Sequence, residues 1–173
     1  LLFQANDVTQ AVSTLEAGVE FAGQNDAFWT KMVSFLQYYQ ADQPTIRILQ
    51  RALDENLLPE LQRANALTAL AKALYHQADF EAALKILGND PSISNRIIRS
   101  QVYWDQGLES LAIQHLESLN RMFPNQREVV PLLTRFYTDS GDTEKAIQIS
   151  KIAYLKNPYS IGASVNYFRA IGA

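Results

Sequence analysis

Two stretches of the sequence carry one pattern: YWDQGLESLAIQHLESLNRMFP at residues 103–124 and YTDSGDTEKAIQISKIAYLKNP at residues 137–158. Four residue types recur at one fixed offset, with Tyr103, Gly107, Ala112 and Pro124 matched by Tyr137, Gly141, Ala146 and Pro158. A fixed period of this size is typical of proteins that stack copies of one short unit, and a period of about 34 residues fits a unit of two helices.

Each matched position has a physical role in such a unit. The tyrosine lies late in the first helix, where a large ring fills the space between helices. The glycine ends that helix, because the chain needs a left-handed residue there and glycine adopts this conformation at little cost. The alanine lies where the two helices cross, and the proline follows the second helix, which it cannot continue.

These eight residues resemble the tetratricopeptide repeat family. The resemblance implies an all-α fold, a right-handed superhelix of antiparallel helix pairs. We expect one array over residues 1–173, with complete units at 25–58, 59–90, 91–124 and 125–158 and partial units at 1–24 and 159–173. The large aromatic residue and the Leu-Gly pair that the family carries early in the first helix are mostly missing, so the array resembles a degenerate member.

Apolar periodicity, caps and prolines predict the helices in more detail. The expected helices are 7–21, 27–40, 44–55, 59–77, 80–87, 92–106, 108–122, 126–140, 143–155 and 160–170, with residues 1–5 as the tail of an earlier helix. Asp is a good N-cap. We therefore place junctions between paired helices at Asn6-Asp7, Ala41-Asp42, Ala78-Asp79 and Gly141-Asp142, with Gly107-Leu108 as the variant that lacks the Asp cap.

The last expected helix has no partner helix to cover its apolar residues Ile161, Val165, Tyr167 and Phe168. Natural arrays usually end in a polar capping helix. We therefore expect the chain to be part of a longer array. The alternative is a complete small domain that its own terminal helices cap.

Composition narrows the function. Apolar residues make up 47% of the chain, enough for a continuous core, and the net charge of −3 disfavours a nucleic-acid surface. No apolar run reaches the ~18 residues of a membrane span. The absence of cysteine excludes disulfides and cysteine zinc sites. The two histidines stand inside expected helices and no catalytic motif appears. We predict no enzyme, no cofactor and no metal site. Cytoplasmic and periplasmic locations both stay open.

The candidate binding surface is the concave face that the first helices of such a stack would line. Counting back three and six residues from each junction gives columns of equivalent positions, with an aromatic row beside a partly basic row. The predicted partner-binding residues are Lys31, Phe35, Tyr38, Lys72, Tyr75, His76, Gln101, Trp104, Arg135 and Thr138, and the same period adds Arg169. Aromatic side chains supply contact area, and basic ones hold acidic groups.

Several alternatives stay open. The aromatic residues either line the binding groove or belong to the ordinary core between helices. The first functional hypothesis is a scaffold that binds a peptide or partner domain on its concave face. The second is a structural spacer in a bacterial envelope or exopolysaccharide-export assembly, with contact to polysaccharide. An RNA-binding array is a third, weaker alternative, because such arrays use basic surfaces. The sequence leaves the oligomeric state open.

Overall fold

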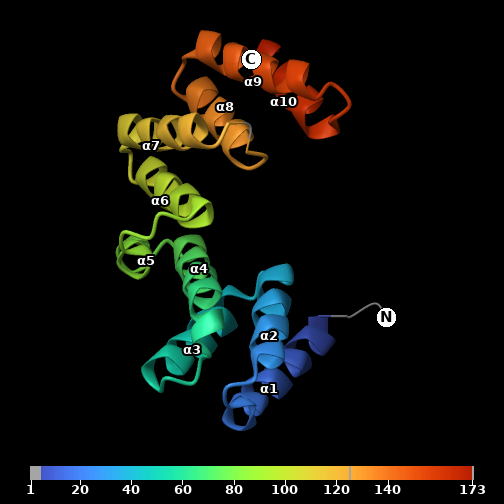
Figure 1. The fold of residues 1–173 in the computed structure, drawn as a ribbon, viewed down its shortest axis with the longest axis vertical. Helices are drawn as coiled ribbons and strands as arrows, with labels where there is room; N and C mark the ends of the chain where they lie inside the picture. The colour runs from blue at the N-terminus through green and yellow to red at the C-terminus, as the bar shows by residue number, and fades with distance from the viewer. Residues whose placement is uncertain (1–4, 125, 173) are drawn as a thin grey trace. The chain divides into compact units, whose positions relative to one another are not determined.

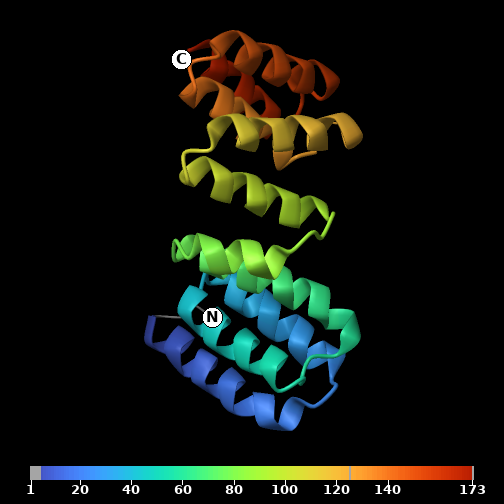
Figure 2. The same ribbon diagram turned by 90° about the vertical axis from the view of Figure 1, so that its left-hand side faces the viewer.

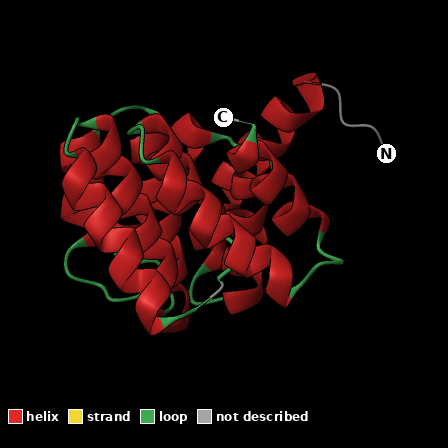
Figure 3. Cartoon of the chain, turned by 90° about the horizontal axis from the view of Figure 1, so that it is seen from above, coloured by secondary structure: helices red, strands yellow, loops and turns green. Residues whose placement is uncertain are grey.

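The computed structural model describes residues 5–124 and 126–172, and within these ranges the chain forms ten α-helices and no strand. Short turns join the helices (Figure 3). The all-α expectation is therefore confirmed. The helices fall into two compact units that divide between Asn89 and Asp90. The expectation of one array over 1–173, with the unit boundaries given above, stays a prediction.

Unit 1 contains α1 (Ala5–Ala22), α2 (Asp26–Tyr38), α3 (Asp42–Asp54), α4 (Glu60–His76) and the short α5 (Phe80–Leu87). In this unit α2 packs against α3 and α4, α4 packs against α5, and α1 packs against α2 and α3 (Figure 1). Large apolar side chains fill the spaces between these helices. Trp29 is fully buried, and its indole N–H donates to the carbonyl of Gly23 at 3.0 Å.

Unit 2 contains α6 (Ile93–Asp105), α7 (Glu109–Met122), α8 (Val129–Asp139), α9 (Thr143–Lys156) and α10 (Ile161–Ile171). Here α6 pairs with α7 and α8 pairs with α9, while α10 packs against both α8 and α9 (Figure 2). Thus α6 and α8 are the first helices of successive pairs, and α10 follows α9 with no second helix after it in the described residues.

The expected helices agree with the observed ones to within a few residues, apart from the N-terminal end. Residues 1–4 lie outside the described range, so the expected helix tail there is largely outside it as well. The expected junction at Asn6-Asp7 is wrong, because α1 begins at Ala5 and runs through both residues. Pro44 lies in the first turn of α3, as expected.

The same type of backbone hydrogen bond closes the turn in each of the four complete helix pairs. The N-cap residue of the second helix donates its N–H to the carbonyl five residues earlier. The four bonds run from Ala41 to Leu36 at 2.9 Å, Asp79 to Leu74 at 3.0 Å, Leu108 to Tyr103 at 2.9 Å and Asp142 to Tyr137 at 2.8 Å. The residue before each donor has a positive φ: Gln40 at 50°, Ala78 at 59°, Gly107 at 76° and Gly141 at 84°. This is the Schellman arrangement of a helix C-terminus.

The hydrogen bonds correct the junction of the first complete pair. Gln40 and Ala41 correspond to Gly141 and Asp142, so the expected junction at Ala41-Asp42 is late by one residue. The Asp42 side chain does not cap α3. Its two carboxylate oxygens instead lie 3.0 and 3.1 Å from Nδ1 of His76.

The other N-cap residues that the sequence predicts are confirmed, with one exception at the start of α6. Asp79 and Asp142 accept the N–H of the third residue after them, at 3.2 and 3.3 Å. At the start of α6 the cap is Ser92, whose hydroxyl accepts the N–H of Asn95 at 3.4 Å. In the sequence, Asp90 followed by Pro91 is a cap-and-first-turn signal. In the structure Asp90 instead accepts the N–H of Ser92 at 2.7 Å, and this bond lowers the pKa of its carboxyl.

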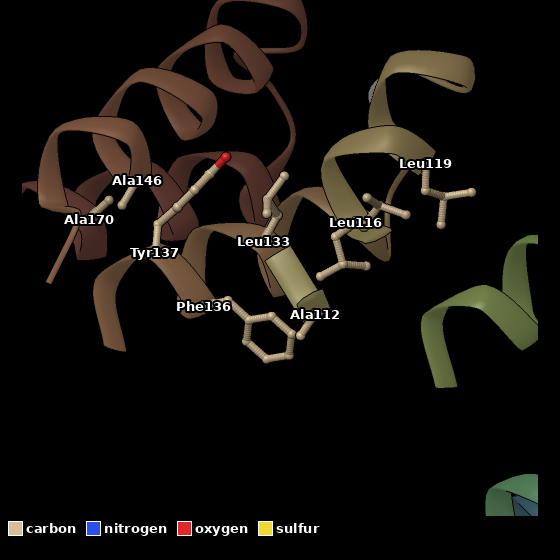
Figure 4. Packing of buried hydrophobic residues seen from close by; sticks show 9 residues of the cluster. Ala112, Leu116, Leu119, Leu133, Phe136, Tyr137, Ala146 and Ala170 are labelled. Carbon is tan, nitrogen blue, oxygen red and sulfur yellow. The ribbon is translucent and has the colours of Figure 1, made fainter. Parts of the chain in front are cut away.

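A small residue lies at each helix crossing, as the repeat pattern predicts. The four equivalent positions are Thr45, Ala83, Ala112 and Ala146, and all are buried. In unit 2 the alanines border a cluster with Leu116, Leu133 and Phe136 (Figure 4). Tyr137 joins this cluster and donates its hydroxyl to Glu117 at 2.5 Å. Burial, and then this carboxylate, raises the pKa of Tyr137. The ring of Tyr103 is half-buried.

Most of the apolar face of α10 is exposed. The sequence predicts no partner helix to cover this face. Ile161 is 81% exposed, and Val165 and Phe168 are also exposed. Tyr167 is different, because its ring stacks on Tyr154 with a centroid separation of 5.3 Å.

The left-handed turn residues generate a paired prediction. Gly141→Ala should destabilise unit 2 by about 1–2 kcal/mol, because a Cβ is disfavoured at this φ although no atom lies within 4 Å of it. Ala78→Gly should stabilise unit 1 by about 0.5 kcal/mol, because relief of the same strain exceeds the entropy that glycine costs. Urea unfolding of both variants checks this, and shifts of equal sign would contradict it.

Candidate functional site

A groove opens along the first helices of unit 2. Its volume is about 470 Å³, and side chains of α6, α8 and α10 line it together with the residue before α8. The lining residues are Ile97, Gln101, Glu128, Pro131, Leu132, Thr134, Arg135, Thr138, Asp139, Asn166, Arg169 and Ala170. The predicted residues Gln101, Arg135 and Thr138, and Arg169 from the same period, thus share one surface.

The floor of the groove mixes apolar and hydrogen-bonding groups. Ile97, Pro131 and Leu132 supply the apolar part. A short hydrogen-bond chain joins α8 to α10: the Asn166 amide donates to the Thr134 hydroxyl at 3.1 Å, and that hydroxyl donates to the Val130 carbonyl at 2.8 Å. The chain holds the Asn166 side chain in place and leaves its amide oxygen as an acceptor.

Both signs of charge are present in the groove. Arg135 and Arg169 contribute guanidinium groups, and Glu128 and Asp139 contribute carboxylates. The Nε atom of Arg135 lies 3.9 Å from Oδ2 of Asp139, and both side chains are about half exposed. An ion pair of this length in solvent stabilises little. The charges are therefore available to a ligand.

Trp104 is part of the support of the groove and does not line it. Its ring stacks on Phe136 with centroids 4.0 Å apart and planes 10° apart. Phe136 is fully buried, and the guanidinium carbon of Arg135 lies 5.2 Å from its ring centroid. The stack joins α6 to α8, and neither ring lines the groove. The main contact of Trp104 is therefore an inter-helix contact, as in the alternative that places the aromatic residues in the core.

The predicted residues of unit 1 have different surroundings. Lys72 and His76 border a hollow of only about 20 Å³ beside Asp42. Lys31 is exposed on α2, and Tyr75 lies against Phe80 with ring centroids 6.1 Å apart.

The corrected junction changes two column assignments in α2. Gln37 and Ser34 correspond to Thr138 and Arg135, whereas the sequence predicted Tyr38 and Phe35 at these positions. Phe35 corresponds to the buried Phe136 and packs against Tyr39, with ring centroids 4.7 Å apart. Tyr38 is 80% exposed, and its ring lies 4.9 Å from that of Tyr39. Their partner-binding role stays a prediction.

Several groove residues were not predicted from the sequence. Ile97, Pro131 and Leu132 precede Gln101 or Arg135 by three or four residues, and Asn166 precedes Arg169 by three. Side chains three and four residues apart share a helix face. Applying this spacing to the basic column would have found them.

The two histidines lie in different units. His76 contacts Asp42, and His115 packs edge-on against Tyr103 with centroids 5.2 Å apart. Burial, and then Arg99 and Arg96, lowers the pKa of His115. Its Nδ1 atom is buried without a hydrogen-bond partner. In the described residues no group of three or more His, Asp and Glu side chains could hold a metal ion. No described helix is both long and apolar enough to cross a membrane.

Solved structures share this arrangement of helices. TTC0263, a thermophilic tetratricopeptide-repeat protein of Thermus thermophilus, superposes over 97% of this chain and 92% of its own, with a TM-score of 0.73 and 16% identity. A tetratricopeptide repeat protein from Parabacteroides merdae superposes over 80% of this chain and 56% of its own, with a TM-score of 0.61 and 17% identity.

The chain has the tetratricopeptide-repeat fold. The structure of Naa15/Naa10 bound to HypK-THB is also similar, with a TM-score of 0.57 and 14% identity over 97% of this chain and 27% of the Naa15/Naa10 chain that matches. Neither the models of protein families nor the curated proteins give a sequence match. In this tetratricopeptide-repeat fold, the groove of unit 2 lies along the first helices of successive pairs.

The stacking of Trp104 on Phe136 generates a stability prediction. Trp104→Ala should destabilise the protein by about 2 kcal/mol, because it removes a half-buried ring and leaves Phe136 partly uncovered. Trp104→Phe should recover most of this loss. Denaturant unfolding measures both, and Tyr159→Ala, at a ring 95% exposed, is the control. An unchanged unfolding midpoint for Trp104→Ala would contradict the supporting role.

Proposed function

We propose that this chain is a non-catalytic scaffold that binds a peptide segment of a partner protein along α6, α8 and α10. The observation that carries the proposal is the groove of about 470 Å³ in unit 2. Its volume falls within the range of about 300–1,000 Å³ for binding sites of small ligands. A short peptide segment would fit such a space.

The chemistry of the groove suits a peptide. Apolar side chains such as Ile97 and Leu132 can cover apolar parts of the ligand, while the amides of Gln101 and Asn166 can bind its backbone N–H and C=O groups. Side chains on three helices contact the ligand at once, so an extended segment would gain contacts along its length. The Naa15/Naa10 structure with HypK-THB bound supports a protein as the class of partner.

A variant that fills the groove tests this function. Thr138→Trp places a large ring in the groove, where Thr138 is half-buried. We expect at least a tenfold loss of affinity, about 1.4 kcal/mol, for every peptide that the wild type selects from a random twelve-residue display library. Far-UV circular dichroism should be unchanged, because the groove is open to solvent.

Gln148→Trp is the matched control. Gln148 is exposed on α9, outside the groove, and receives the same added ring. This variant should bind the selected peptides as the wild type does. Equal binding by Thr138→Trp and wild type, or no peptide selected at all, would contradict peptide binding in this groove.

A second candidate is the structural spacer of a bacterial envelope or exopolysaccharide-export assembly. The aromatic cluster of Phe35, Tyr38 and Tyr39 in unit 1 favours it, because an exposed ring can stack on the apolar face of a sugar. On a glycan array, Tyr38→Ala should then lose binding that Tyr159→Ala keeps. A wild-type protein that binds no glycan on the array contradicts this candidate.

A further inference from the structure

Two arginines lie one repeat period apart on α8 and α10. Arg135 on α8 and Arg169 on α10 are one repeat period apart, and both line the groove of unit 2. Gln101 holds the same position on α6, one period before Arg135. One position of the repeat therefore supplies three adjacent hydrogen-bonding side chains along the groove, and two of them are cationic.

Neither guanidinium is fully engaged by the protein. The one carboxylate within 4.0 Å of Arg135 in the described part of the chain is that of Asp139, at 3.9 Å, and the Arg135 side chain is 54% exposed while its guanidinium also lies over the Phe136 ring. Among the described residues, no carboxylate oxygen is recorded within 4.0 Å of Arg169, which is exposed. Arg47 in unit 1 is a contrast, because two of its nitrogens donate to Glu16 at 2.6 and 2.8 Å. The donors of Arg135 and Arg169 are free to bind ligand oxygens.

The groove is not positive overall, because Glu128 and Asp139 also line it. A diffuse attraction for any polyanion is therefore disfavoured. Recognition depends instead on where each arginine lies. The carboxylates also disfavour a ligand that places negative charge at every position.

The separation of the two arginines sets the spacing of their ligands. The helices α8 and α10 pack directly against each other, and packed helices have axes about 8–10 Å apart. An extended polyproline-type peptide rises about 3.1 Å per residue with three residues per turn. Its residues i and i+3 therefore lie on one side, about 9 Å apart.

We infer that the groove selects an extended peptide with two acidic side chains three residues apart. One carboxylate binds Arg135 and the other binds Arg169. The held amide of Asn166 accepts a backbone N–H between them. The two intervening residues lie over Pro131 and Leu132, so small or proline residues fit there. This inference rests on the proposed peptide-binding function and names the class of its ligand.

Fluorescence anisotropy with defined peptides tests the inference. The probes are labelled twelve-residue peptides with blocked ends, containing Glu-Pro-Ala-Glu, Gln-Pro-Ala-Gln or Glu-Ala-Glu in one proline and alanine background. The wild type should bind the first probe at least tenfold more tightly than the second and the third. This preference should shrink as salt rises, because the arginines are exposed.

Charge-neutral variants locate the effect. In the double variant Arg135→Gln with Arg169→Gln, the preference for the Glu-Pro-Ala-Glu probe over its Gln analogue should fall to within twofold. Arg121→Gln should keep the full preference, because Arg121 is exposed on α7 and does not line the groove. Retention of the preference in the double variant overturns the assignment to these arginines.

The outcomes separate this inference from the proposed function. Equal binding of the Glu and Gln probes overturns the inference, and so does equal binding of the closer-spaced Glu probe. If library peptides without paired acidic residues bind the wild type and Thr138→Trp blocks them, the groove is a peptide site with another specificity. If the wild type binds neither library peptides nor probes, the proposed function fails together with the inference.

Discussion

The hydrogen bond that closes each helix pair is the constraint on which the other structural features depend. It joins the N-cap of the second helix to the carbonyl five residues earlier, and it needs a left-handed residue between the two helices. Once this bond is made, the positions of both helices relative to the turn are fixed. The small residue four positions after the donor is then buried at the crossing in every pair, from Thr45 to Ala146.

The same constraint explains the groove of unit 2. The helices α6 and α8 each end in a turn of the same type. Residues at equal distances before the two turns therefore face the same way on both helices. The repeat period extends this equivalence to α10. A groove built in this way needs no special loop. Its chemistry is set by which residues occupy a few repeated positions, and its support comes from buried stacks such as that of Trp104 on Phe136.

The sequence predicted the fold well where glycine marks the turn. Gly107 and Gly141 identify their junctions without ambiguity, and the residues counted back from them, Gln101, Arg135 and Thr138, lie together in the groove. In unit 1 the turn is marked by Gln40 and Ala78, which carry no such signal. Asp42 has the residue type of an N-cap and was predicted to be one, but its carboxylate contacts His76. The groove residues themselves could be predicted only in part. The sequence positions of Trp104 and Arg135 do not reveal that only Arg135 lines the groove, because that distinction depends on Phe136, whose ring stacks on that of Trp104. Packing partners that lie one unit away in the chain decide such cases, and a pattern within one helix does not contain them.

The placement of the two tryptophans has a spectroscopic consequence. The sequence contains only Trp29 and Trp104, one in each unit, and the first is fully buried while the second is half-buried against a phenylalanine ring. Their emission should therefore differ in wavelength, since indole fluorescence responds to solvent contact. A chain that keeps one indole reports the melting of a single unit, so the two halves of the protein carry separate optical labels for following whether they unfold together.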